Sequence, residues 1–431
     1  MLHLAASLMI ASSARIDKEG GWMKTDWIGI LGTGQSLSVG ARAMPAISIE
    51  QPFGNLKLST GDLKWPVDPN DPGLVLTPLV EPIGHLAPNY PSSWPLNIDG
   101  ETPHTGAANQ ISSMAMDKLH RNVLTVHAAV GEDGQGIVYL KKGAPHKGLN
   151  GRSFEGGMIV TKAEARLAKA ARKSFGVASI FVTHGESDCG NPNYATELYQ
   201  LWSDYNHDIK EITGQTQDLL MIVSQQNAVM DDSVSTQAQW RLGIDHPESF
   251  VCACPKYQYP YFTDAVHLNA AGYQLLGEKY GQVFFERVLL RHNWRPLQPE
   301  KIDHRGTRLV VHFHVPVRPL VWDTTMPQPH QGTPEWSNGK GFEVRSSDGK
   351  RVTINSAEIG RDGRSVVITC ATDPGSKADV TYAMVAEKQK RTQPSDGTVR
   401  WGLLRDSDPF VGSTSKLPQP NYCVAFKWIL E

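Results

Sequence analysis

The chain has 431 residues, of which 40% are apolar and 20% charged, and its formal net charge is −2. This balance excludes a disordered chain and shows no sign of a nucleic-acid-binding surface. The length allows two or three domains with a large buried core, and no apolar run reaches the roughly 18 residues of a membrane span.

The N-terminal extension, residues 1–25, begins with an apolar stretch that ends in Ala-Ser-Ser-Ala. This stretch, Leu2–Ala14, is similar to a short signal peptide but has no Lys or Arg before its apolar run. We therefore expect either a secreted or periplasmic protein or a cytoplasmic one.

The five cysteines lack the spacing of a zinc site or a disulfide framework. Cys252 and Cys254 lie two residues apart in a predicted strand. We interpret them as buried small apolar residues.

An apolar strand at Trp27–Leu31 leads into Gly32-Thr33-Gly34 and then into Gln35-Ser36. The glycines allow a sharp turn that presents a serine at the carboxyl end of a strand, where ligands bind in α/β sheets. The alternative is an ordinary turn with a capping serine.

Residues 41–105 are rich in proline and glycine and show little apolar periodicity. A loop-rich insertion of this length is typical of a wall or lid over a functional site. Trp65 and Trp94 are candidates to stack on a ligand, and the alternative is that they fasten the insertion to its domain.

Helices and nearly continuous apolar strands alternate from residue 109 to residue 290, which indicates a parallel sheet covered on both faces. We predict helices at 109–120, 161–175, 194–213 and 270–290, and strands at 122–130, 177–183, 218–224 and 250–254.

The alternation stops near Arg291, and a domain boundary is expected around 293–299. Short strands separated by Asp-Gly turns then predict a C-terminal β-sandwich domain over residues 300–431. Its predicted strands lie near 308–315, 342–345, 352–354, 366–370, 380–385 and 424–429. The sandwich could bind carbohydrate, mediate oligomerisation or cover part of the first domain.

Asp264 stands three residues before His267, just ahead of a predicted helix. A carboxylate placed against an imidazole in this way orients the ring and stabilises its protonated form, as a general base requires. The alternative is a helix cap beside a surface histidine.

Three blocks in this order resemble the SGNH hydrolase superfamily, in its sialate O-acetylesterase and carbohydrate esterase branch. The blocks are Gly34-Gln35-Ser36, His184-Gly185-Glu186-Ser187-Asp188, and Asp264 through Asn269 followed by Ala270–Tyr273. The resemblance covers about residues 26–290. It implies a three-layer α/β/α, flavodoxin-like catalytic domain with a parallel sheet at 26–292.

The resemblance also implies the roles of the site residues. Ser36 would be the nucleophile, His267 its general base and Asp264 the residue that orients His267. The oxyanion hole would use the backbone N–H of Ser36 and of Gly134, with Gly131 as the alternative.

His184 stands where the branch has a glutamine that donates to the oxyanion, so it would either donate in the same way or only support its loop. Gln35 would contact substrate.

The implied activity is a serine esterase that removes O-acetyl groups from carbohydrate, with acetylated carbohydrate as the partner and no metal or cofactor. Two alternatives stay open: an esterase or lipase acting on lipid or aryl esters, and a non-catalytic glycan-binding protein on the same fold. The sequence indicates no nucleic-acid partner and leaves the oligomeric state open.

Overall fold

The computed structural model describes residues 21–60, 65, 67–86, 96–97, 100–148, 150–386 and 399–431. The signal-like stretch Leu2–Ala14 lies outside these residues. Within them, no helix combines the length and the apolar character that a membrane crossing requires.

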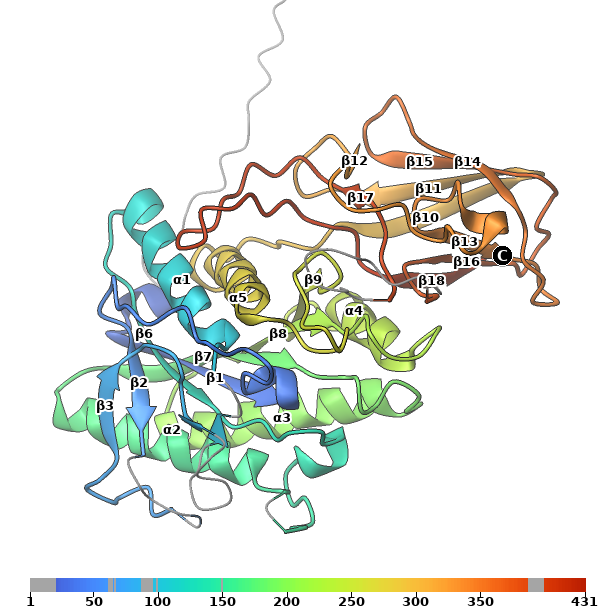
Figure 1. Cartoon of the computed structure of the whole chain (residues 1–431). Helices are drawn as coiled ribbons and strands as arrows, with labels where there is room; N and C mark the ends of the chain where they lie inside the picture. Colours follow the sequence, from blue (N-terminus) through green and yellow to red (C-terminus); the bar gives the residue numbers. More distant parts are fainter. Residues whose placement is uncertain are drawn as a thin grey trace, which may run out of the picture.

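A seven-stranded sheet lies at the centre of the N-terminal part of the described chain (Figure 1). Its edge strand β3 runs antiparallel to β2, and the other neighbouring strands pair in parallel. In spatial order the strands are β3 (Val75–Pro78), β2 (Leu56–Ser59), β6 (Leu124–Ala129), β1 (Trp27–Gly34), β7 (Phe175–Thr183), β8 (Leu220–Gln225) and β9 (Phe250–Pro255).

Helices cover both faces of this sheet. Helices α1 (Pro103–Leu119) and α5 (Ala270–Phe284) pack with Ile28, Ile30 and Phe181 on one face. On the other face are α2 (Ser153–Ala170), α3 (Tyr194–Thr213) and α4 (Val234–Asp245). The mixed α/β architecture expected from the alternating pattern is therefore confirmed.

Helices α1 and α5 cross very closely, and the crossing depends on glycine. A methyl group at Gly277 would lie 2.3 Å from the carbonyl oxygen of Pro103, and one at Gly281 would lie 2.7 Å from that of Ala107. Helix α5 begins directly after the Asp264–Asn269 block, so this crossing fixes the direction in which the chain leaves that block.

Several predicted boundaries were wrong. Helix α2 starts at Ser153, eight residues before the predicted helix, and much of it is buried. Gly157 allows Tyr205 and Leu31 to pack closely against it, which propensity alone does not reveal. Phe175 begins strand β7 and does not end a helix, and α4 was not predicted at all. Residues two apart in a regular strand share a face, yet Cys252 and Cys254 pack into the cores on opposite faces of the sheet, because the register between β8 and β9 shifts between them. All five cysteines are free.

The proline-rich region 41–105 contains more regular structure than its composition indicates. Strands β2 and β3 extend the sheet beyond β6, and Asn55 anchors them because its side-chain oxygen accepts the backbone N–H of Thr125 at 2.9 Å. The region also contributes β4 (His85–Leu86) and β5 (Leu96–Asn97). Shorter helical turns along the chain are Trp22–Lys24, Ser36–Ser38, Ile137–Tyr139, Phe285–Leu289 and Pro334–Trp336.

The C-terminal part is rich in antiparallel sheet, where short strands separated by Asp-Gly turns were predicted. The order β10-β11-β15-β14 forms one sheet, β13-β16-β18 a second and β12-β17 a third. The strands are β10 (Gln298–Arg305), β11 (Arg308–His314), β12 (Val321–Trp322), β13 (Phe342–Arg345), β14 (Ile354–Ile359), β15 (Ser365–Cys370), β16 (Asp379–Tyr382), β17 (Leu404–Arg405) and β18 (Phe426–Ile429).

The two parts of the chain share one hydrophobic core, which runs from the α3–α4 face of the central sheet into the C-terminal sheets. Trp240 of α4 packs on Phe426 of β18, with ring centroids 6.1 Å apart. The side-chain amide of Gln225, at the end of β8, exchanges two 2.8 Å hydrogen bonds with the backbone of Ala425. In Figure 1 the C-terminal part accordingly lies against α4 and β9.

Candidate active site

Ser36 follows β1 in a turn that requires glycine. Gly34 has φ 141°, and a methyl group there would lie 2.1 Å from the carbonyl oxygen of Thr183. Ser36 then opens a short 3-10 turn in which Ser38 donates to the carbonyl oxygen of Gln35 through both its N–H and its hydroxyl, each at 2.7 Å. Because Ser36 is the first residue of this turn, its own N–H is not used within it.

The Asp264–Asn269 block brings its histidine to Ser36. The Ser36 hydroxyl donates to His267 Nε2 at 2.8 Å, and His267 Nδ1–H donates to Asp264 Oδ2 at 2.8 Å. The second carboxylate oxygen of Asp264 accepts the backbone N–H groups of Val266 and His267, each at 2.9 Å. Asn269, and not Asp264, caps helix α5 by accepting the N–H of Gly272.

These contacts keep Asp264 charged. Its partial burial opposes ionisation, but the hydrogen bonds from the backbone of His267 and Val266 and from the imidazole outweigh burial, so the pKa of Asp264 lies below its ordinary value. The guanidinium of Arg42 lies 3.9 Å from the same carboxylate and over the ring of Phe262. The carboxylate therefore accepts from His267 Nδ1–H and leaves Nε2 to face Ser36.

The two candidate oxyanion glycines differ in their distance from Ser36's turn. A methyl group at Gly131 would lie 1.9 Å from the hydroxyl of Ser38, and the next residue, Glu132, donates its N–H to the carbonyl oxygen of Gly34. A methyl group at Gly134 would meet nothing within 4 Å. The geometry therefore favours Gly131, the alternative, over Gly134.

His184 is buried and uses both ring nitrogens within the protein. Nε2–H donates to the carbonyl oxygen of Gln135 at 3.0 Å, and Nδ1 accepts the hydroxyl of Tyr194 at 3.0 Å. Burial lowers the pKa of His184 despite the opposite influence of Asp188, so the ring is neutral at pH 7. These contacts leave no N–H for a substrate oxyanion and favour the second interpretation, a support for the loop.

The predicted substrate-contact residues have different surroundings. Gln35 is 4% exposed, and its side-chain oxygen accepts the backbone N–H of Ser187 at 3.1 Å, so it links two loops of the site. Trp65 packs under the guanidinium of Arg152 at 5.2 Å, with His146 against its ring. Trp94 lies outside the described residues.

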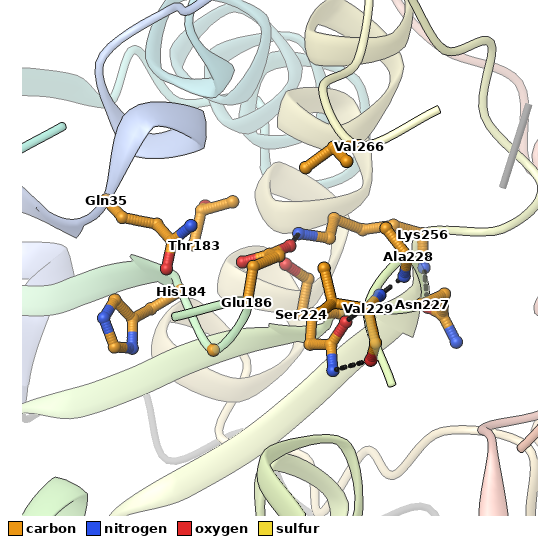
Figure 2. Close-up of polar contacts among 12 residues, drawn as sticks. Gln35, Thr183, His184, Glu186, Ser224, Asn227, Ala228, Val229, Lys256 and Val266 are labelled. Carbon is orange, nitrogen blue, oxygen red and sulfur yellow. Dashed lines mark hydrogen bonds and ion pairs between the residues drawn. The ribbon is translucent and has the colours of Figure 1, made fainter. Parts of the chain in front are cut away.

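A buried ion pair beside these loops was missed in the sequence. Lys256 Nζ donates to Glu186 Oε1 at 2.6 Å, and the two side chains are 1% and 4% exposed. Figure 2 shows Lys256 extending toward Glu186, with His184 turned away. The only local signal is that Lys256 directly follows an apolar strand, at the carboxyl edge where Ser36 also lies.

Neither a protein-family model nor a curated protein sequence matches this chain. A solved structure of a carbohydrate acetylesterase from Xanthomonas citri aligns over 93% of this chain and 80% of its own, with a TM-score of 0.52 and 10% identity. A protein from Arabidopsis thaliana aligns over 61% of this chain and 99% of its own, with a TM-score of 0.44 and 15% identity. NanS aligns over 52% of this chain and 71% of its own, with a TM-score of 0.28 and 12% identity.

The last two alignments are too weak to bear on the fold. The first covers nearly the whole chain, C-terminal part included, and at 10% identity it establishes similarity of fold alone. This chain therefore has the fold of a carbohydrate acetylesterase, as the resemblance of its three motifs predicted.

Proposed function

We propose that this protein is a serine esterase that removes O-acetyl groups from carbohydrate. The observation that carries the proposal is the hydrogen-bonded series from Ser36 through His267 to Asp264 at the carboxyl end of β1. It is the arrangement that an acyl-enzyme mechanism needs, and the whole-chain similarity to a carbohydrate acetylesterase supports the substrate class.

In this mechanism the Ser36 hydroxyl attacks the ester carbonyl carbon while His267 Nε2 takes its proton. The backbone N–H groups of Ser36 and Gly131 stabilise the oxyanion, a contribution of about 2.7–4 kcal/mol per donor. His267 then protonates the departing sugar oxygen, which leaves an acetyl group on Ser36. Water, deprotonated by the same imidazole, then attacks the acetyl carbon; the bond to Ser36 breaks, acetate leaves, and His267 returns the proton to the Ser36 oxygen.

The finer assignments belong to the same proposal. Residues 26–292 form a flavodoxin-like SGNH hydrolase domain, and residues 300–431 form an accessory β-sandwich. A substrate contact through the NH₂ group of Gln35, and stacking by Trp65, remain predictions of this proposal.

The test is acetate release from acetylated xylan, pectin, sialic acid and bacterial polysaccharide, alongside 4-nitrophenyl acetate and octanoate. Wild-type protein should release acetate from at least one carbohydrate, and Ser36→Ala should abolish turnover without unfolding the protein. Ser203→Ala on α3 serves as the matched control and should keep full activity. Undiminished turnover by Ser36→Ala, or a preference for the octanoate ester with no carbohydrate hydrolysed, would refute the proposal.

A further inference from the structure

Arg400 of the C-terminal part is buried against the loop that follows β8. The side chain is 1% exposed, and burial lowers the pKa of its guanidinium to about 10. It donates to the carbonyl oxygen of Asn227 at 3.2 Å and to the side-chain oxygen of Gln226 at 3.2 Å. The loop at the carboxyl end of β8 is thus held by a residue from the other part of the chain.

The contacts continue from this loop to the buried ion pair. The side-chain oxygen of Asn227 accepts the backbone N–H of Lys256 at 2.9 Å, which fixes the position of the lysine at the end of β9. Lys256 then holds the carboxylate of Glu186 at 2.6 Å. Figure 2 shows Asn227, Lys256 and Glu186 in this sequence, with Gln35 and Thr183 beyond them.

A second set of contacts joins the same two loops through α4. Gln226 N–H donates to the side-chain oxygen of Gln239 at 2.9 Å, and Gln239 donates to the carbonyl oxygen of His184 at 2.5 Å. Ser235 donates to the carbonyl oxygen of Gly185 at 2.7 Å. The loop that carries Glu186 is therefore held at three successive residues.

This loop in turn holds the turn of Ser36. The residue after Glu186, Ser187, donates its backbone N–H to the side chain of Gln35, the neighbour of Ser36. An unbroken series of polar contacts therefore runs from Arg400 to the nucleophile turn, although the mechanism uses neither Lys256 nor Glu186.

The ion pair of Lys256 and Glu186 joins two loops, but burying its two charges is energetically unfavourable. The second carboxylate oxygen of Glu186 is buried and has no hydrogen-bond partner among the described residues. A buried pair with an unsatisfied oxygen contributes little net stability compared with apolar residues of similar size, whereas it does impose one specific geometry.

We propose that Lys256 and Glu186 are positioning residues for Ser36 and that Arg400, by holding them, makes the C-terminal part a component of the esterase site. This inference rests on the proposed function. It assigns the C-terminal part a role within the site. A module that only binds carbohydrate would, by contrast, leave the chemical step unaffected.

The decisive variant is the double substitution Glu186→Gln/Lys256→Met, made in the full chain because the two parts share one core. It removes both charges together and leaves no uncompensated buried ion, so the fold should survive. Gln237→Leu is the matched control, since Gln237 exchanges hydrogen bonds of 2.9 and 3.0 Å with the backbone of Lys427 in the same interface, outside this series.

We expect the double variant to keep its melting temperature within a few degrees while kcat for 4-nitrophenyl acetate falls on the order of 10²-fold, with KM little changed. The rate at which a fluorophosphonate labels Ser36 should fall in parallel. Arg400→Lys should also lower kcat. Gln237→Leu should lower the melting temperature and leave kcat unchanged.

A double variant that folds with wild-type kcat overturns the inference, as does a Gln237→Leu variant that loses as much kcat as the double variant. If the double variant does not fold, Arg400→Lys decides by the same kcat criterion. Wild-type protein that hydrolyses no acetyl ester refutes the proposed function and this inference with it. If wild-type protein is active and Ser36→Ala abolishes that activity, the proposed function holds. A double variant with wild-type kcat then refutes the positioning role alone.

Discussion

Replacement of Asp264 by asparagine tests the hydrogen-bonded series most directly. The asparagine oxygen can still accept the backbone N–H groups of Val266 and His267, so the turn should keep its shape. The NH₂ group then faces His267 Nδ1, which must accept instead of donate. The imidazole proton moves to Nε2, the nitrogen that should take the proton of Ser36.

We expect a loss of kcat from this change of tautomer. The equivalent change in a serine hydrolase triad lowers kcat by ~10⁴, which corresponds to about 5.4 kcal/mol of transition-state stabilisation. The folded state loses only a partly exposed charged contact, so the free energy of unfolding should fall by about 1 kcal/mol or less.

The assay compares kcat for 4-nitrophenyl acetate with thermal unfolding of the same preparation. Asp373→Asn is the matched control, because Asp373 accepts a hydrogen bond from His304 at 3.0 Å in an exposed pair of the C-terminal part. It should leave kcat unchanged. Asp264→Asn protein that retains more than a tenth of wild-type kcat would show that Asp264 does not set the tautomer of His267.

Two predictions concern stability. Burial, and then the nearby Glu101 carboxylate, raise the pKa of Glu81 to about 8, so the folded chain holds a proton there that the unfolded chain has released. Stability should therefore fall as the pH rises from about 4.5 to about 8. Glu81→Gln should reduce the difference between the melting temperatures at pH 5 and pH 8.5. A difference as large as that of wild-type protein would contradict the role of Glu81. Trp240→Ala removes the 1% exposed ring that packs on Phe426, so the free energy of unfolding should fall by about 3–5 kcal/mol. Calorimetry should show the whole chain unfolding in a single transition at a lower temperature; two separate transitions would contradict a shared core.

The helix and strand predictions succeeded where the local pattern was sufficient. The alternation of Leu309, Val311 and Phe313 predicted a strand with one buried face, and these side chains are buried in β11. Helix α4 was missed because its apolar residues are few and it packs on both the sheet and the C-terminal part. Strands β2 and β3 were missed because no local pattern shows that Asn55 anchors β2 beside β6, with β3 on the far side of β2.

The sequence by itself determined the features that depend on residues close together in the chain. Gly34 needs the positive φ that only glycine adopts easily, and Asp264 reaches His267 because only two residues of one tight turn separate them. Only the tertiary structure decided that His184 faces Gln135 and Tyr194, and that Arg400 and Lys256 hold the loops around Ser36. Such contacts join residues far apart in sequence, and their partners are set by how the sheet, the helices and the C-terminal part pack.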